Sequence, residues 1–129
     1  YELYNLVKEK YPNLNAITYT NDVYKYMDQA DLLISKAGGI TMFEAIYSMT
    51  PICVINPFLE QEIRNAKFIE ENKLGKVLLE KGNKLVSDIM ILLSSEVELT
   101  KIKNNMENIK KQIASVSLAG EMKCIRETI

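Results

Sequence analysis

The sequence contains no histidine and no tryptophan, and only two cysteines among its 129 residues. Without histidine, the chain lacks the most common general base of enzymes and the most common ligand of transition metals. Proton transfer by this chain would therefore depend on carboxylate, lysine, tyrosine or cysteine side chains, and no metal site is predicted. Cys53 and Cys124 form no CxxC pair, which predicts reduced, small hydrophobic residues in a cytoplasmic protein.

The sequence also has no excess of positive charge and no long hydrophobic run. Lys and Arg number 16 against 17 Asp and Glu, a net charge of −1, whereas domains that bind nucleic acid are usually strongly basic. The longest uncharged stretch, residues 45–59, is interrupted by Pro51 and Pro57, and a membrane-spanning helix needs about 20 apolar residues. We therefore expect no nucleic-acid partner and no membrane span. The start at Tyr1, without Met or a signal peptide, indicates a piece of a longer protein.

What the sequence does contain is an ordinary share of hydrophobic residues, 47%, in two alternating patterns. The length predicts one domain over residues 1–129. Short apolar runs predict strands at 16–19, 31–35, 52–55 and 76–79, and helical periodicity predicts helices at 2–10, 21–28, 41–49, 60–73, 82–94 and 96–117. This alternation predicts an α/β fold with a parallel sheet. Ligands of such sheets bind beyond the carboxyl ends of the strands.

Three local features carry more specific expectations. The run 31–35 has three consecutive apolar residues, Leu32 to Ile34, as in strands buried on both faces, and Gly75 suits the left-handed position after a helix. The last predicted helix has an apolar stripe that favours packing on the core over a coiled coil. Its lysines, at positions 101, 103, 110 and 111, are diluted by glutamates, which favours a solvated face over contact with anionic lipid.

The segment 35–45 follows the second predicted strand and contains two adjacent glycines, Gly38 and Gly39. A strand, a Gly-Gly turn and a helix start together form an anion site suited to a diphosphate. Thr41 would add a donor, and Glu44 would accept hydrogen bonds from a ribose diol. The alternative is a capping box, in which Thr41 and Glu44 only satisfy the N–H groups of their own helix. The segment contains neither GxGxxG nor a P-loop, so NAD and kinase-type nucleotide sites are not predicted.

The segment 55–66 follows the next predicted strand and contains Gln61 and Glu62. Amide and carboxylate groups in this position would bind a polyhydroxylated ligand. The alternative is that Glu60 and Glu62 only complement the dipole of the following helix. Because both segments follow neighbouring strands of a parallel sheet, we expect them to meet at one end of the sheet.

Three motifs in this order resemble the C-terminal domain of family 28 glycosyltransferases: 31–45 (DLLISKAGGITMFEA), 51–57 (PICVINP) and 61–66 (QEIRNA). These enzymes have the GT-B architecture, two Rossmann-like α/β/α domains that face each other across a cleft. The likeness is greatest to diacylglycerol glucosyltransferases and monogalactosyldiacylglycerol synthases, and it covers residues 14–80. The resemblance implies a UDP-sugar as substrate and no cofactor.

The resemblance also implies a role for each motif residue. Gly38, Gly39, Ile40 and Thr41 would face the UDP diphosphate, with Lys36 as a basic partner. Glu44 would bind the ribose, and Gln61 and Glu62 would hold the sugar hydroxyls, supported by Asn65. Where relatives often have glycine before the Gln-Glu pair, this chain has Glu60.

In this family the acceptor-side base and the membrane-facing surface lie on the N-terminal domain, so no catalytic residue is expected in this chain. The first strands of the donor domain are also expected to be missing. The resemblance thus implies part of a peripheral, cytoplasmic-face enzyme that transfers a hexosyl group to a lipid such as diacylglycerol, and an inactive isolated chain. Two alternatives stay open: a stand-alone subunit of a two-chain GlcNAc transferase, and a non-catalytic α/β nucleotide-binding domain.

Overall fold

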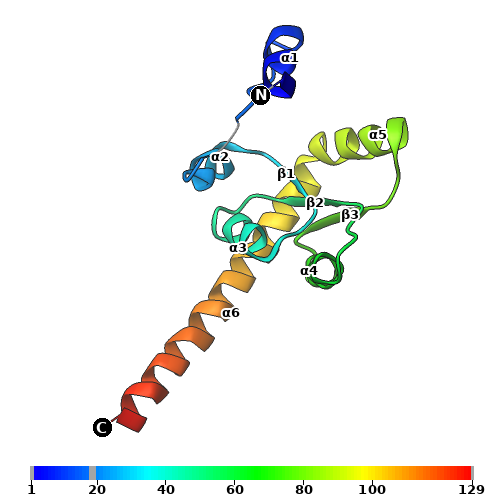
Figure 1. Cartoon of the computed structure of the whole chain (residues 1–129). Coiled ribbons are helices and arrows are strands. Elements are labelled where there is room, and N and C mark those ends of the chain that lie inside the picture. Colours follow the sequence, from blue (N-terminus) through cyan, green and yellow to red (C-terminus); the bar gives the residue numbers. More distant parts are fainter. Residues whose placement is uncertain (1, 18–19, 129) are drawn as a thin grey trace.

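The computed structural model describes the backbone of residues 2–17 and 20–128, and the side chains of 5–7, 9–17, 20–39 and 41–115. Figure 1 shows a small sheet with helices around it and a long C-terminal helix. In chain order the elements are α1 (Glu2–Lys10), α2 (Val23–Gln29), β1 (Leu33–Ser35), α3 (Gly39–Tyr47), β2 (Ile52–Ile55), α4 (Glu60–Glu71), β3 (Gly75–Leu78), α5 (Gly82–Leu93) and α6 (Glu96–Thr128).

The strands form a parallel sheet in the order β1-β2-β3. The register places Leu33 beside Ile52, and Ile52 beside Gly75. β2 lies in the centre and is almost completely buried, as expected for a short run of aliphatic residues covered on both faces. The predicted α/β fold with a parallel sheet is therefore confirmed.

The helices complete the core around this sheet. α3 contacts both α4 and α6, and α4 contacts β3. Ile102 and Met106 of α6 are buried in the core, next to partly buried Leu99 and Ile109. The apolar stripe of the last helix thus packs on the core over this stretch, as predicted. α6 continues to Thr128, beyond the predicted end at 117. The side chain of Val116, the last residue of the predicted apolar stripe, lies outside the described residues.

Two predicted strands need correction. Ala16 and Ile17 form no strand, and the other two residues of the predicted run lie outside the described residues. The run 31–35 forms a strand only from Leu33 to Ser35. Its Ile34 is 46% exposed, so β1 is not buried on both faces. Apolar composition is the same in an edge strand and a central one, which is why the sequence pattern did not distinguish them.

The predicted role of Gly75 is wrong. α4 ends at Glu71, earlier than predicted, and the left-handed residue after it is Lys73, with φ of 54°. The N–H of Leu74 donates to the carbonyl of Ile69 (2.9 Å), which closes the helix end. Gly75 instead begins β3, where a Cβ atom would overlap the carbonyl oxygen of Ile52. This position needs glycine because two strands approach closely there.

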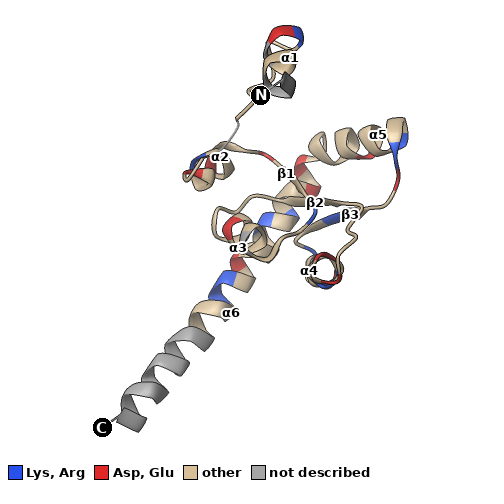
Figure 2. Ribbon diagram, in the orientation of Figure 1, with Lys and Arg blue, Asp and Glu red and all other residues tan. Residues whose placement is uncertain are grey.

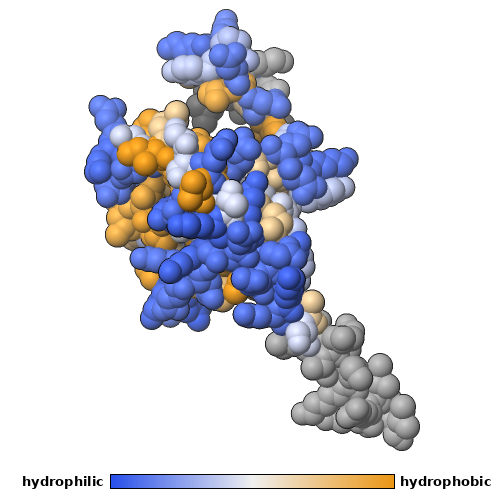
Figure 3. Space-filling model, turned by 180° about the vertical axis from the view of Figure 1, so that it is seen from behind, coloured by the Kyte–Doolittle hydropathy of each residue, from blue (hydrophilic) through white to orange (hydrophobic). Residues whose placement is uncertain are grey.

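The surface carries both signs of charge. Figure 2 shows Lys and Arg interspersed with Asp and Glu along α6, and Lys101, Lys103 and Lys111 are exposed. Lys110 differs, because its Nζ donates to the carbonyl of Tyr47 (3.2 Å) at the end of α3. Figure 3 shows apolar side chains gathered over α5, where Val86, Met90 and Ile91 are exposed. None of the helices in the described part of the chain has the length and hydrophobicity to cross a membrane.

Candidate functional site

The turn between β1 and α3 leaves the first N–H groups of the helix free. Gly38 is the N-cap, and the first bond within the helix runs from the N–H of Met42 to the carbonyl of Gly38 (3.0 Å). The N–H groups of Gly39, Ile40 and Thr41 therefore have no acceptor within the helix. With the positive end of the helix dipole, they form an arrangement suited to an anion. The predicted order of strand, glycine turn and helix is confirmed, although the helix begins at Gly39 rather than at 41.

The earlier helix start rules out the alternative of a capping box at Thr41 and Glu44. The N-cap is Gly38, and no side chain caps this helix. Thr41 stands at the third helical position rather than at the N-cap, and Glu44 at the sixth rather than the third, so the two cannot pair as a capping box. Both side chains are partly exposed. Capping therefore does not explain the presence of Thr41 and Glu44.

The two glycines of the turn have different structural roles. Gly38 has φ of −62° and ψ of 144°, which any residue adopts, and a Cβ atom added to it would meet nothing within 4 Å. Neither the backbone nor the packing thus requires glycine at this position. At Gly39, an added Cβ would lie 3.3 Å from Nε2 of Gln61 and 3.8 Å from Nδ2 of Asn65. Gly39 therefore lets the second segment approach closely.

The two predicted segments do meet. Gln61 and Asn65 lie on the first two turns of α4, and Asn65 Nδ2 donates to the carbonyl of Ala37 (2.8 Å). The amide of Gln61 lies beside Gly39. Both segments follow the carboxyl ends of neighbouring parallel strands, which is where the topology places them. The structure thus brings together the turn at Gly38 and the amide groups of α4.

Glu62 fits the alternative prediction, in which it stabilises the start of its own helix. Its Oε1 accepts hydrogen bonds from the N–H groups of Leu59 (2.8 Å) and Phe58 (3.2 Å). The bond from Leu59 is the main cause of a lowered pKa of Glu62, and partial desolvation opposes it. The bond from Phe58 and the charge of Lys36 lower this pKa further. Lys36, from the first segment, therefore acts electrostatically on the second.

The lowered pKa of Glu62 predicts a pH dependence of stability. The ionised carboxylate stabilises the folded chain above the usual pKa of 4.5, and this contribution is lost as the pH falls through the lower pKa of the folded state. We expect wild type to be more stable than Glu62→Gln at neutral pH, with a difference that shrinks in acid. Urea unfolding of both proteins across this range measures the difference. A difference independent of pH would contradict the assignment, and Glu60→Gln is the control in the same helical turn.

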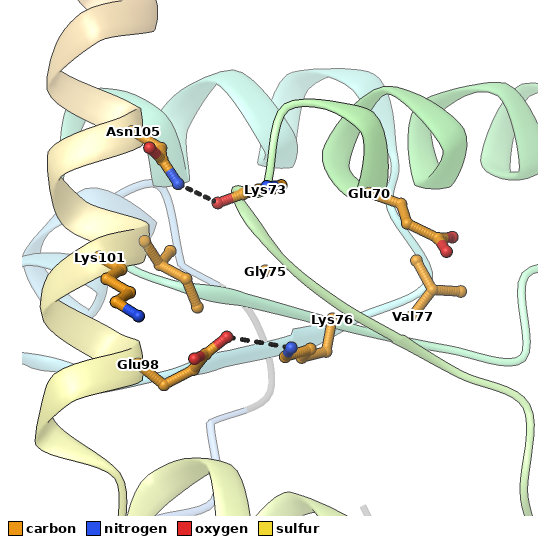
Figure 4. A pocket seen from close by; sticks show the side chains of 9 residues that line it. Glu70, Lys73, Gly75, Lys76, Val77, Glu98, Lys101 and Asn105 are labelled. Carbon is orange, nitrogen blue, oxygen red and sulfur yellow. Dashed lines mark hydrogen bonds and ion pairs between the residues drawn. The ribbon is translucent and has the colours of Figure 1, made fainter.

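A cavity of about 420 Å³ lies elsewhere, between the end of α4, β3 and the first turns of α6. Figure 4 shows that Lys76 pairs with Glu98 (3.0 Å) and that Asn105 Nδ2 donates to the carbonyl of Lys73 (3.0 Å). The ion pair with Lys76 is the main cause that lowers the pKa of Glu98. Sequence reasoning missed this cavity, because its lining residues form no motif.

Comparison with known proteins places the chain in a family. Residues 2–117 match the family model described as "Glycosyltransferase family 28 C-terminal domain", a range that includes both segments of the site. Two relatives, from Staphylococcus aureus strains JH9 and Newman, carry the name "Processive diacylglycerol beta-glucosyltransferase". Each is 27% identical to this chain over 110 residues, which is 85% of this chain and 28% of the relative. The chain thus aligns with little more than a quarter of each relative's length.

Proposed function

Because the chain belongs to the glycosyltransferase family 28 C-terminal domains, we propose that residues 1–129 are the donor-binding domain of a glycosyltransferase that uses a UDP-sugar. One observation carries this proposal. In front of the free N–H groups of α3 stands a glycine, Gly38, that neither the backbone nor the packing requires. The open space at Gly38 supports the approach of a diphosphate to these groups.

Each site residue then has a role in binding the donor. The N–H groups of Gly39, Ile40 and Thr41 bind the diphosphate, with Lys36 as a neighbouring positive charge. Glu44 accepts hydrogen bonds from the ribose. Its freedom from capping supports this role.

The amide groups of α4 receive the sugar. Gln61 lies beside Gly39, so its amide can reach sugar hydroxyls attached to a diphosphate bound there. Glu62 commits Oε1 to its own helix start, which leaves Oε2 for a hydroxyl. Asn65, on the next turn of the helix, holds the glycine turn beside them through its bond to the carbonyl of Ala37.

In the proposed reaction, this domain acts on the leaving group. Negative charge grows on the departing UDP. The N–H groups of α3 and the charge of Lys36 stabilise it, because they are oriented before the reaction begins. No side chain of this domain takes the acceptor proton, so that base belongs to an acceptor domain. The reaction needs no cofactor.

We propose that the acceptor is a lipid such as diacylglycerol, supported by the name that the relatives carry. These relatives are much longer than the matched region, which supports an acceptor domain outside it. The whole enzyme would work at the cytoplasmic face of a membrane, and the isolated donor domain would be inactive.

Glu44→Ala tests the ribose assignment. We expect the affinity for UDP to fall about 10- to 100-fold, because a hydrogen bond to a charged group contributes about 1.5–3 kcal/mol. Isothermal titration calorimetry with UDP measures this effect. Glu60→Ala is the control, because Glu60 is exposed at the start of α4. The Glu60→Ala chain should bind UDP as wild type does. Equal affinity of wild type and Glu44→Ala would contradict the assignment.

A further inference from the structure

Ala37 adopts a backbone conformation that alanine rarely adopts. Its φ is 73°, in the left-handed region that favours glycine, and the residue is only 2% exposed. A non-glycine residue stays in this region only when its surroundings hold it there. Ala37 immediately precedes Gly38, the glycine at the start of the proposed diphosphate site.

Two side chains from different elements hold the backbone of Ala37. Its N–H donates to Oγ of Ser35 (3.1 Å), the last residue of β1, and its carbonyl accepts a hydrogen bond from Nδ2 of Asn65 (2.8 Å) on α4. Both bonds are partly buried. The N–H and the carbonyl of the left-handed residue are thus each bound by a side chain.

These bonds also orient the peptide that follows. The carbonyl of Ala37 and the N–H of Gly38 belong to one planar trans peptide and point in opposite directions. Because Asn65 fixes the direction of this carbonyl, it also fixes the direction of the Gly38 N–H. The same bond ties the turn to the helix that carries Gln61.

We propose that Ser35 and Asn65 are positioning residues that hold Ala37 left-handed and thereby aim the turn at the diphosphate. This inference rests on the proposed function, because it assigns a purpose to that site. It gives Ser35 a role that the family motifs do not, and it commits Nδ2 of Asn65 to the turn rather than to a sugar.

The test uses the full chain with Ser35→Ala and Asn65→Ala, each also combined with Ala37→Gly. We expect each single variant to bind pyrophosphate and UDP about tenfold more weakly. Glycine adopts the left-handed conformation without help, so Ala37→Gly should restore part of the affinity. A direct contact between Asn65 and the ligand would not be restored in this way. Calorimetry measures the affinities, and the Ser35 variant keeps the test decisive should Asn65→Ala not fold.

Asn72→Ala is the matched control, because Asn72 Nδ2 makes the same kind of bond to the carbonyl of Phe68 (2.9 Å) at the far end of α4. It should lose stability and keep its pyrophosphate affinity. The inference is overturned if wild type does not bind pyrophosphate, if the variants bind as wild type does, or if Ala37→Gly restores nothing. If instead the variants behave as expected and wild type binds ADP as well as UDP, the proposed function fails and the positioning role stands.

Discussion

Gly38→Ala is expected to lower the affinity of the chain for UDP about 100-fold or more, with almost no change in the free energy of unfolding. Alanine adopts φ of −62° and ψ of 144° without strain, and its methyl group would contact nothing within 4 Å. In the proposed site this open space receives the diphosphate, so the methyl group would hold the ligand away from the free N–H groups of α3. Loss of two hydrogen bonds to a charged diphosphate costs about 3 kcal/mol or more.

Gly82→Ala is the matched control for this prediction. Gly82 has φ of 61° and also has open space around it, and it begins α5, outside both segments of the site. Alanine there costs about 1–2 kcal/mol of stability and should leave UDP affinity unchanged. Calorimetry should show a loss of UDP affinity only in Gly38→Ala, and urea unfolding should show a loss of stability only in Gly82→Ala. A Gly38→Ala chain that binds UDP as wild type does would contradict the proposed site.

Gly75→Ala is expected to lower the free energy of unfolding by about 3 kcal/mol, the upper part of the range for overpacked sites. Its methyl group would overlap the carbonyl oxygen of Ile52, a backbone atom that cannot turn away. β3 would have to separate from β2 at this point. Urea unfolding measures the loss, and Gly38→Ala provides the same chemical change without a clash. A change of less than about 0.5 kcal/mol, typical of surface substitutions, would contradict the register of β2 and β3.

Gly75 also shows where sequence reasoning fails. A glycine a few residues after a helical pattern is typical of a helix end, and the sequence shows nothing of Ile52, which lies on another strand. The actual left-handed residue, Lys73, has no local signature. Contacts between residues distant in the sequence decide such positions, and periodicity reports only local structure.

The candidate site was predictable to the extent that topology determines it. The rule for parallel sheets placed the two segments together, and Asn65 does contact the turn at Ala37. The helix start was mispredicted because both glycines were assigned to the turn, whereas Gly38 is the N-cap and Gly39 is already helical. The bonds from Ser35 and Asn65 were not predictable, since they depend on the left-handed backbone of Ala37.

The most direct test of the proposed donor site is a titration of the ¹⁵N-labelled full chain with UDP, followed by amide NMR shifts. We predict saturable shifts of the amides of Gly38, Gly39, Ile40 and Thr41 and of Glu44, with weaker binding of ADP. UDP shifts confined to other regions, such as the cavity near Lys101, or equal binding of UDP and ADP, would contradict the proposed donor-binding function.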